Sequence, residues 1–125
     1  MPVNHSINYV ELPGKNFDAL EAFYTAAFGW TFTDYGPEYR AFSDGSFNGG
    51  FRRSGKKSKV DRGASLVVLY SDNLEDTRDR VVSSGGTIHQ EIFSFPGGRR
   101  FHFLDPDTVD LTEQSGTFTL RRTSE

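Results

Sequence analysis

Two acidic residues near opposite ends of the chain and one histidine are suited to acid–base chemistry. Glu11 lies in an alternating segment near the N-terminus, Asp110 lies in another near the C-terminus, and His102 stands between two phenylalanines. If Glu11 and Asp110 face each other across a cleft, they can hold a cationic ligand, or one can act as a base with a raised pKa. The alternative is that each carboxylate is partly exposed and inert.

A short segment after a Gly-Gly turn adds cationic side chains. His102 in this segment is either a polar contact or general base for a ligand, or a strand histidine whose hydrogen bonds are satisfied. Arg99 and Arg100 can clamp a carboxylate or a phosphate at the edge of a cleft, or form a solvated pair in a hairpin. The residue types leave both interpretations open.

The chain contains an internal repeat, and the repeat predicts such a cleft. The segment 9–32 reads as strand, break, helix and strand, and the segment 66–89 repeats this order after a shift of 57 residues. Only four of the 24 aligned positions are identical, but the order of periodicity, helix cap and helix stop is the same. Two half-sheets related in this way can enclose one shared cleft.

Each half reads as βαβββ. In the first half we expect a helix that starts at Asn16 and stops at Gly29, and strands at 6–12, 30–33, 38–43 and 46–53. In the second half we expect a helix that starts at Asn73 and stops at Gly85-Gly86, and strands at 64–70, 87–93, 99–104 and 109–114. The sequence thus predicts an α+β fold, with a linker at 54–63 between repeats at about 5–53 and 64–115.

Strand alternation assigns side chains to the cleft, because neighbouring residues point to opposite faces. Val10 and Leu12 should face a helix, which sends Tyr9 and Glu11 to the cleft. The same argument sends Leu66, Val68 and Tyr70 to the cleft from the second half, together with Asp110. Only a register slipped by one residue would bring in Glu113 instead. If Phe101 and Phe103 face the helix, Arg100 and His102 also face the cleft.

Composition limits the classes of function. The 125 residues suffice for one domain, and the formal net charge of −3 gives no general case for nucleic acid binding. The linker at 54–63 is rich in basic residues, but it has no aromatic residues between them, and nucleic acid binding favours such a mixture. The absence of cysteine excludes disulfides and thiolate metal sites. With no apolar leader and no segment long enough to span a bilayer, we expect a cytoplasmic protein without membrane contact.

The layout and several local phrases resemble the glyoxalase/bleomycin-resistance/dioxygenase superfamily, also called the vicinal oxygen chelate fold. The most specific phrase is Ala22-Phe23-Tyr24 followed by Phe28-Gly29-Trp30, and the segments 7–12, 72–75 and 103–107 add to it. The segment 95–103 looks like a glyoxalase-related branch of unsettled function. The resemblance covers roughly residues 5–115. It implies one glyoxalase-like domain, a cupped and mostly antiparallel sheet around the shared cleft, and a homodimer.

The resemblance also implies where a metal would bind. In metal-dependent members a divalent cation is held by His, Gln or Glu side chains from both halves. The matching positions here fall at Tyr9, Gly49, Leu66 and Asp110. Gly49 and Leu66 have no donor side chain, and a neutral tyrosine is a poor ligand. We therefore expect no metal cofactor.

Three functions remain open at this stage. The first is a metal-free protein that binds a small molecule, as bleomycin-resistance proteins do. Its expected ligand-binding residues are Tyr9, Glu11, Phe51, Leu66, Val68, Tyr70, Arg100, His102 and Asp110. The second is a lyase, isomerase or dioxygenase-like enzyme related to lactoylglutathione lyase, with Glu11, Asp110 and His102 as catalytic residues. The third is a plain dimerisation or regulatory module.

Overall fold

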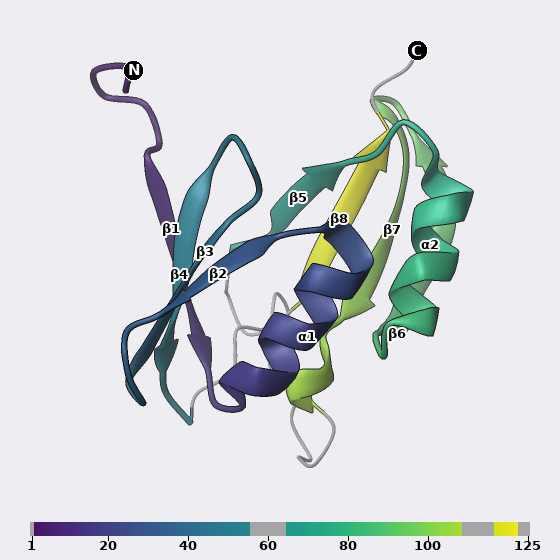
Figure 1. The fold of residues 1–125 in the computed structure, drawn as a ribbon. Coiled ribbons are helices and arrows are strands. Elements are labelled where there is room, and N and C mark those ends of the chain that lie inside the picture. Colours follow the sequence, from purple (N-terminus) through teal and green to yellow (C-terminus); the bar gives the residue numbers. More distant parts are fainter. Residues whose placement is uncertain (1, 56–64, 109–116, 123–125) are drawn as a thin grey trace.

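The computed structural model describes residues 2–55, 65–108 and 117–122, and these form an α+β fold (Figure 1). The first sheet has the strand order β1-β4-β3-β2, and the second has the order β5-β8-β7-β6. In both sheets the first two strands of the order are parallel and the other neighbours are antiparallel. The expected α+β class and mostly antiparallel pairing are therefore confirmed, with the strands divided between two four-stranded sheets.

The elements of the first half begin and end close to the expected residues. They are β1 (Tyr9–Gly14), α1 (Phe17–Phe28), β2 (Thr31–Asp34), β3 (Tyr39–Ser43) and β4 (Asn48–Arg53). The side chain of Asn16 accepts a hydrogen bond from the backbone N–H of Ala19 at 3.1 Å, which caps α1. Gly29 ends the helix with a φ of 75°, a conformation that glycine adopts without strain.

The second half contains β5 (Val67–Tyr70), α2 (Leu74–Ser83), β6 (Thr87–Phe95), β7 (Gly98–Leu104), the short 3-10 helix η2 (Pro106–Thr108) and β8 (Thr117–Arg122). Asn73 caps α2 through the backbone N–H of Asp76 at 3.1 Å. Among the described residues, neither helix is long and apolar enough to cross a membrane.

One strand prediction is wrong, and another cannot be compared with the described residues. Pro13 and Gly14 were expected to end the first strand, but β1 continues through both. The reason is that β1 lies at the edge of its sheet, where a proline that lacks an N–H is tolerated. The strand expected at 109–114 falls on residues 109–116, which lie outside the described residues, so it stays a prediction; the structure describes β8 at Thr117–Arg122.

Both sheets share one aromatic core, with α1 at its centre. Tyr24 of α1 stacks on Trp30 and contacts Phe51 of the first sheet, with ring centroids 4.5 and 5.8 Å away. Phe23, also on α1, contacts Phe103 of the second sheet at 5.9 Å. Helix α1 therefore covers part of both sheets, and α2 packs beside it on the second (Figure 1). The side of each sheet away from this core carries neither helix.

Candidate functional site

We call the helix-free sides of the two sheets the first and second open faces. Burial and register assign side chains to them: Leu12, Phe42 and Phe51 pack into the core, so their strand neighbours point outward. The first open face carries Tyr9, Glu11, Thr31, Thr33, Tyr39, Ala41, Asn48 and Arg52. A shallow pocket of about 290 Å³ on this face includes Tyr9, Thr33 and Ala41.

A pair of tyrosines dominates the first open face. The hydroxyls of Tyr9 and Tyr39 lie 2.6 Å apart and share a hydrogen bond. Burial, followed by the hydrogen bonds to Tyr9 and Glu11, raises the pKa of Tyr39 well above its ordinary value of 10.0. Gly50 makes room for this ring, because a Cβ at that position would overlap the Tyr39 hydroxyl. Glu11 also lies 3.6 Å from Arg52, so its carboxylate is partly neutralised.

The second open face combines apolar and cationic side chains. Val67 and Leu69 pack against the core, which turns Val68 and Tyr70 outward with 41% and 63% of their surface exposed. Phe101 and Phe103 are fully buried, as expected, and Arg100 and His102 therefore lie on the opposite side of β7. The guanidinium of Arg100 lies over the rings of Phe93 and Phe95, at 5.5 and 4.9 Å.

His102 is stacked and half-buried on the same face. Its ring is nearly parallel to that of Phe93, with centroids 5.8 Å apart. Burial, the charge of Arg100 and the charge of His89 all lower the pKa of His102 below 6.5. The imidazole is therefore neutral at pH 7, which is the form that can accept a proton.

The structure separates the residues that were expected to meet in one cleft. Tyr9 and Glu11 lie on the first open face, whereas Val68, Tyr70, Arg100 and His102 lie on the second. Since both sheets turn their other sides to a common core, one chain does not bring Glu11 and His102 together. Leu66 is half-buried just before β5, and Asp110 lies outside the described residues.

Phe51 was expected in the ligand-binding site, but it lies in the core. Its side chain is 2% exposed and contacts Tyr24, so it points toward α1. Gly49 shares its parity: a Cβ on Gly49 would meet the buried Phe42 ring. The open-face positions of β4 are therefore Asn48, Gly50 and Arg52, one residue out of step with the expectation.

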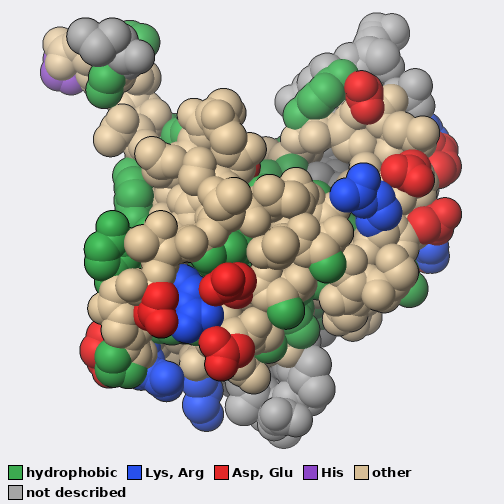
Figure 2. All heavy atoms as spheres, in the orientation of Figure 1, with side chains coloured by type: hydrophobic (Ala, Val, Ile, Leu, Met, Phe, Trp, Pro, Cys, Tyr) green, Lys and Arg blue, Asp and Glu red, His purple; other side chains and the backbone are tan. Residues whose placement is uncertain are grey.

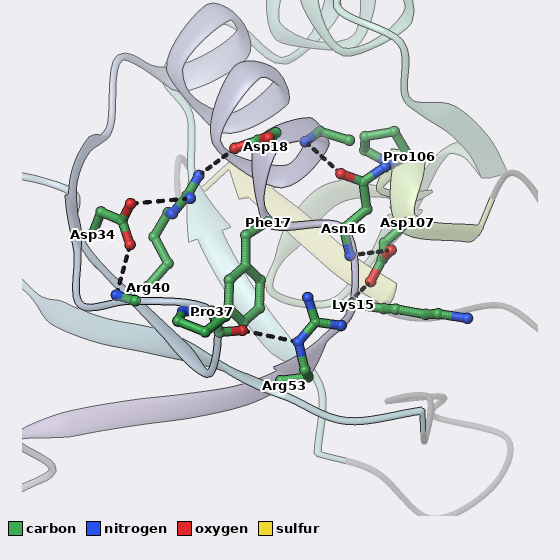
Figure 3. Close-up of a pocket in the computed structure, with 12 residues that line it drawn as sticks. Lys15, Asn16, Phe17, Asp18, Asp34, Pro37, Arg40, Arg53, Pro106 and Asp107 are labelled. Carbon is green, nitrogen blue, oxygen red and sulfur yellow. Dashed lines mark hydrogen bonds and ion pairs between the residues drawn. The ribbon is translucent and has the colours of Figure 1, made fainter.

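A pocket larger than the one on the first open face lies at the start of α1. It has a volume of about 760 Å³ and is lined by α1, the β2–β3 turn and η2 (Figure 3). Arg40 and Arg53 both lie over the Phe17 ring, at 5.7 and 5.6 Å. Arg40 is 3.0 Å from both Asp18 and Glu21. Figure 2 shows such mixed clusters of acidic and basic side chains beside α1 and over α2.

Two buried aspartates, Asp107 in the lining of this pocket and Asp105 close to it in the chain, have structural roles. Asp107 accepts hydrogen bonds from the backbone N–H groups of Lys15 and Asn16, at 2.9 and 3.1 Å (Figure 3). Asp105 accepts one from the hydroxyl of Tyr24 at 3.0 Å. These two aspartates connect the segment around η2 in the second half to α1 and the residues just before it. The sequence points to these residues only as part of the segment 103–107 in the family resemblance, and their burial was not predicted.

Comparisons with known proteins agree with this architecture. Residues 6–111 match the family model for the Glyoxalase/Bleomycin resistance protein/Dioxygenase superfamily. No curated protein matches the sequence. A glyoxalase-related enzyme from Fulvimarina pelagi is similar in structure, with a TM-score of 0.70 and 17% identity over 94% of this chain and 88% of the other.

Two further structures show the same fold. One is a glyoxalase/bleomycin resistance protein/dioxygenase family enzyme from Burkholderia phytofirmans, with a TM-score of 0.73 and 16% identity over 94% of this chain and 98% of the other. The second is the fosfomycin resistance protein FosX from Listeria monocytogenes, solved with Mn(II) and a dihydroxypropylphosphonic acid. Its TM-score is 0.73, at 16% identity over 95% of this chain and 90% of the other. The chain belongs to the glyoxalase/bleomycin resistance protein/dioxygenase superfamily.

Proposed function

We propose that the protein binds a small organic molecule in a cleft formed between two copies of the chain. The observation that carries this proposal is the division of the expected site between two open faces. Tyr9, Tyr39 and Glu11 supply one wall, and Val68, Tyr70, Arg100 and His102 supply the other. A C2 dimer that sets the first open face of one copy against the second open face of its partner forms two identical clefts.

The donor set of the open faces does not fit a resident divalent metal. The phenol of Tyr9 is bonded to Tyr39, and the neighbouring position on β4 is Gly50, which carries no side chain. Within the described parts of the chain, no three His, Asp or Glu side chains come close enough to hold an ion. Hard divalent ions need more oxygen and nitrogen donors than Glu11 and His102 provide. We therefore propose a binding mode without a metal.

Added metal is expected to leave the thermal stability unchanged. A ligand that binds only the folded state raises the melting temperature, so a tight metal site would be visible in this measurement. The test is thermal unfolding of chelator-treated protein with nickel, zinc, manganese or iron(II) added in turn. A rise of several degrees with any of these ions would contradict the metal-free binding mode.

Subunit mixing tests the shared cleft directly. Ala41→Trp should block the first open face and Val68→Trp the second, because each places a large ring on a helix-free surface. We expect each variant to lose most of its binding of the neutral fluorophore N-phenyl-1-naphthylamine. When the two variants are unfolded together and refolded at equal amounts, about half of the dimers are mixed and each has one unblocked cleft, so about a quarter of the clefts recover.

The outcome distinguishes the proposed cleft from a cleft within one chain. If each chain formed its own cleft, mixing would restore no binding, because every chain carries one of the two blocking substitutions. Size-exclusion chromatography with light scattering provides the matching control that both variants are dimers. A monomeric wild-type protein would also contradict the proposal.

The alternative is an enzyme of the same superfamily, and the neutral state of His102 at pH 7 favours it as a base. Glu11 and Asp110 would then be the acidic partners. The test is product formation from methylglyoxal with a thiol, and from catechols. Turnover that is lost in Asp110→Ala, with folding intact, would support the enzyme over the binding protein.

A further inference from the structure

Within the described parts of the chain, Arg100 differs from the other half-buried arginines in having no carboxylate partner. Arg40 pairs with Asp18, Arg78 with Glu91, and Arg99 with Glu75. Arg99 is the direct neighbour of Arg100 in β7, and its partner lies 2.6 Å away on α2. Among the residues that the structure describes, the side chain of Arg100 contacts two aromatic rings and forms no ion pair or hydrogen bond.

The guanidinium of Arg100 is held in place and partly desolvated. Phe93 is its direct partner across the β6–β7 pairing, and Phe95 lies two residues further along the same face. The Nε atom is out of contact with solvent and has no hydrogen-bond acceptor. A buried donor without an acceptor is unfavourable, and a fixed side chain loses little entropy when a ligand binds. The two terminal nitrogens of the group remain available for an acceptor.

The surroundings of Arg100 favour an anion with an apolar body. The positive charge of Arg100 helps to lower the pKa of His102, so its electrostatic effect reaches a neighbouring side chain on this face. Val68 and Tyr70 add exposed apolar surface. Tyr70 and Arg100 share one register row, separated only by β8, which places their backbones about 10 Å apart. That span suits a ligand with about two fused rings.

We propose that the bound molecule carries a carboxylate that pairs with Arg100, and an apolar ring system that lies toward Val68 and Tyr70. The planar guanidinium can present two N–H donors to the two carboxylate oxygens. The inference rests on the proposed small-molecule function and names the chemical class of the ligand. The second open face would then bind the anionic group of the ligand, whereas the first open face offers two phenols and a carboxylate.

The test compares 2-naphthoate with its neutral analogue 2-naphthamide by titration calorimetry on the dimer. We expect naphthoate to bind more tightly, and Arg100→Gln to weaken naphthoate by about tenfold or more. Arg99→Gln is the matched control: it removes the same charge from the adjacent residue, whose side chain bonds to α2. Arg99→Gln should change the binding of neither compound, and Arg100→Gln should weaken the binding of naphthamide much less than that of naphthoate.

The titration of His102 gives a second readout that a purely structural role of Arg100 would not move. Naphthoate should raise the pKa of His102 in the wild type, because it neutralises the nearby guanidinium. Arg100→Gln should raise it without any ligand, and naphthoate should then have little further effect. The imidazole signals in NMR spectra recorded across the pH range measure both effects, and retained dispersion of the spectra shows that the variant is folded.

The possible outcomes distinguish a failure of the carboxylate assignment from a failure of the proposed small-molecule function. Equal binding of naphthoate and naphthamide, or equal weakening by Arg99→Gln, overturns the carboxylate assignment and leaves small-molecule binding supported. If neither naphthalene binds but acetate still raises the pKa of His102 through Arg100, the anion site stands and the proposed function fails. If acetate also has no effect, both are overturned.

Discussion

Phe103→Ala is expected to lower the free energy of unfolding by about 3–5 kcal/mol, the usual cost of removing a fully buried phenylalanine ring. Phe103 belongs to β7 of the second sheet, yet its ring contacts Phe23 and Phe28 of α1, at 5.9 and 5.8 Å. The ring is fully buried, so its removal leaves a cavity between the two halves. Urea unfolding, followed by fluorescence and circular dichroism, measures the loss.

The same experiment reports whether the two halves unfold as one unit. Phe47→Ala is the control, because Phe47 is only half-buried in the β3–β4 turn and its loss should be clearly smaller. If the shared core joins both halves, the Phe103 variant still unfolds in a single transition. A change close to zero for Phe103→Ala, or two separate transitions in the wild type, would contradict the shared core.

Local patterns predicted the helices and most strand faces well. Asn16 and Asn73 were identified as helix caps because their side chains bond to backbone groups only three residues away. Alternation assigned β1, β5 and β7 correctly, since apolar residues such as Leu12, Leu69 and Phe101 mark the buried side. These features depend on neighbours in the sequence, so the sequence contains the needed information.

The faces of β4 could not be predicted in this way. Gly49 and Gly50 carry no side chains, so the strand has no alternation on which to base a register. The assignment becomes clear only from other strands, because Phe42 packs above Gly49 and Tyr39 lies over Gly50. One misplaced residue then sent Phe51 to the wrong face. Tyr39 was missed for the same reason, although it bonds to the expected Tyr9.

The position of the last strand and the relation of the two halves depend on distant contacts. The segments 109–114 and 117–122 both alternate, and only pairing with β5 and β7 distinguishes β8. The internal repeat predicted two equivalent halves, but no local pattern states which sides of the sheets meet. Contacts such as that of Phe23 with Phe103 determine which sides of the sheets pack together. This packing places the two walls of the expected cleft on separate faces of the chain.

Asp105→Ala is the second substitution with a large expected effect, about 2–6 kcal/mol of lost stability. One carboxylate oxygen of Asp105 accepts the Tyr24 hydroxyl at 3.0 Å, and the other accepts the backbone N–H of Asp107 at 3.2 Å. Both aspartates are at most 7% exposed, and Tyr24 is fully buried. The substitution removes the Asp105 acceptor from two donors that water does not reach, and losing such an acceptor costs about 1–3 kcal/mol for each donor.

The pH dependence of stability provides an independent sign of this contact. Burial, and then the carboxylate of Asp105, raises the pKa of Tyr24 well above 10.0. The folded state thus holds this proton more tightly than the unfolded state. The resulting stability is present below pH 10 and is lost as the pH rises further. Tyr39 acts in the same direction, so Tyr24→Phe should reduce the alkaline loss of stability without removing it.

A double-mutant cycle separates the hydrogen bond from the burial of a charge. Tyr24→Phe removes the donor, so adding Asp105→Ala should then cost less than it does in the wild type, with a coupling energy of about 1–2 kcal/mol. Asp79→Ala, at an exposed position on α2, is the matched control and should change stability little. Strictly additive losses would mean that Asp105 does not act through Tyr24. A clear coupling would show that an aspartate of the second half stabilises the first helix through the Tyr24 hydroxyl.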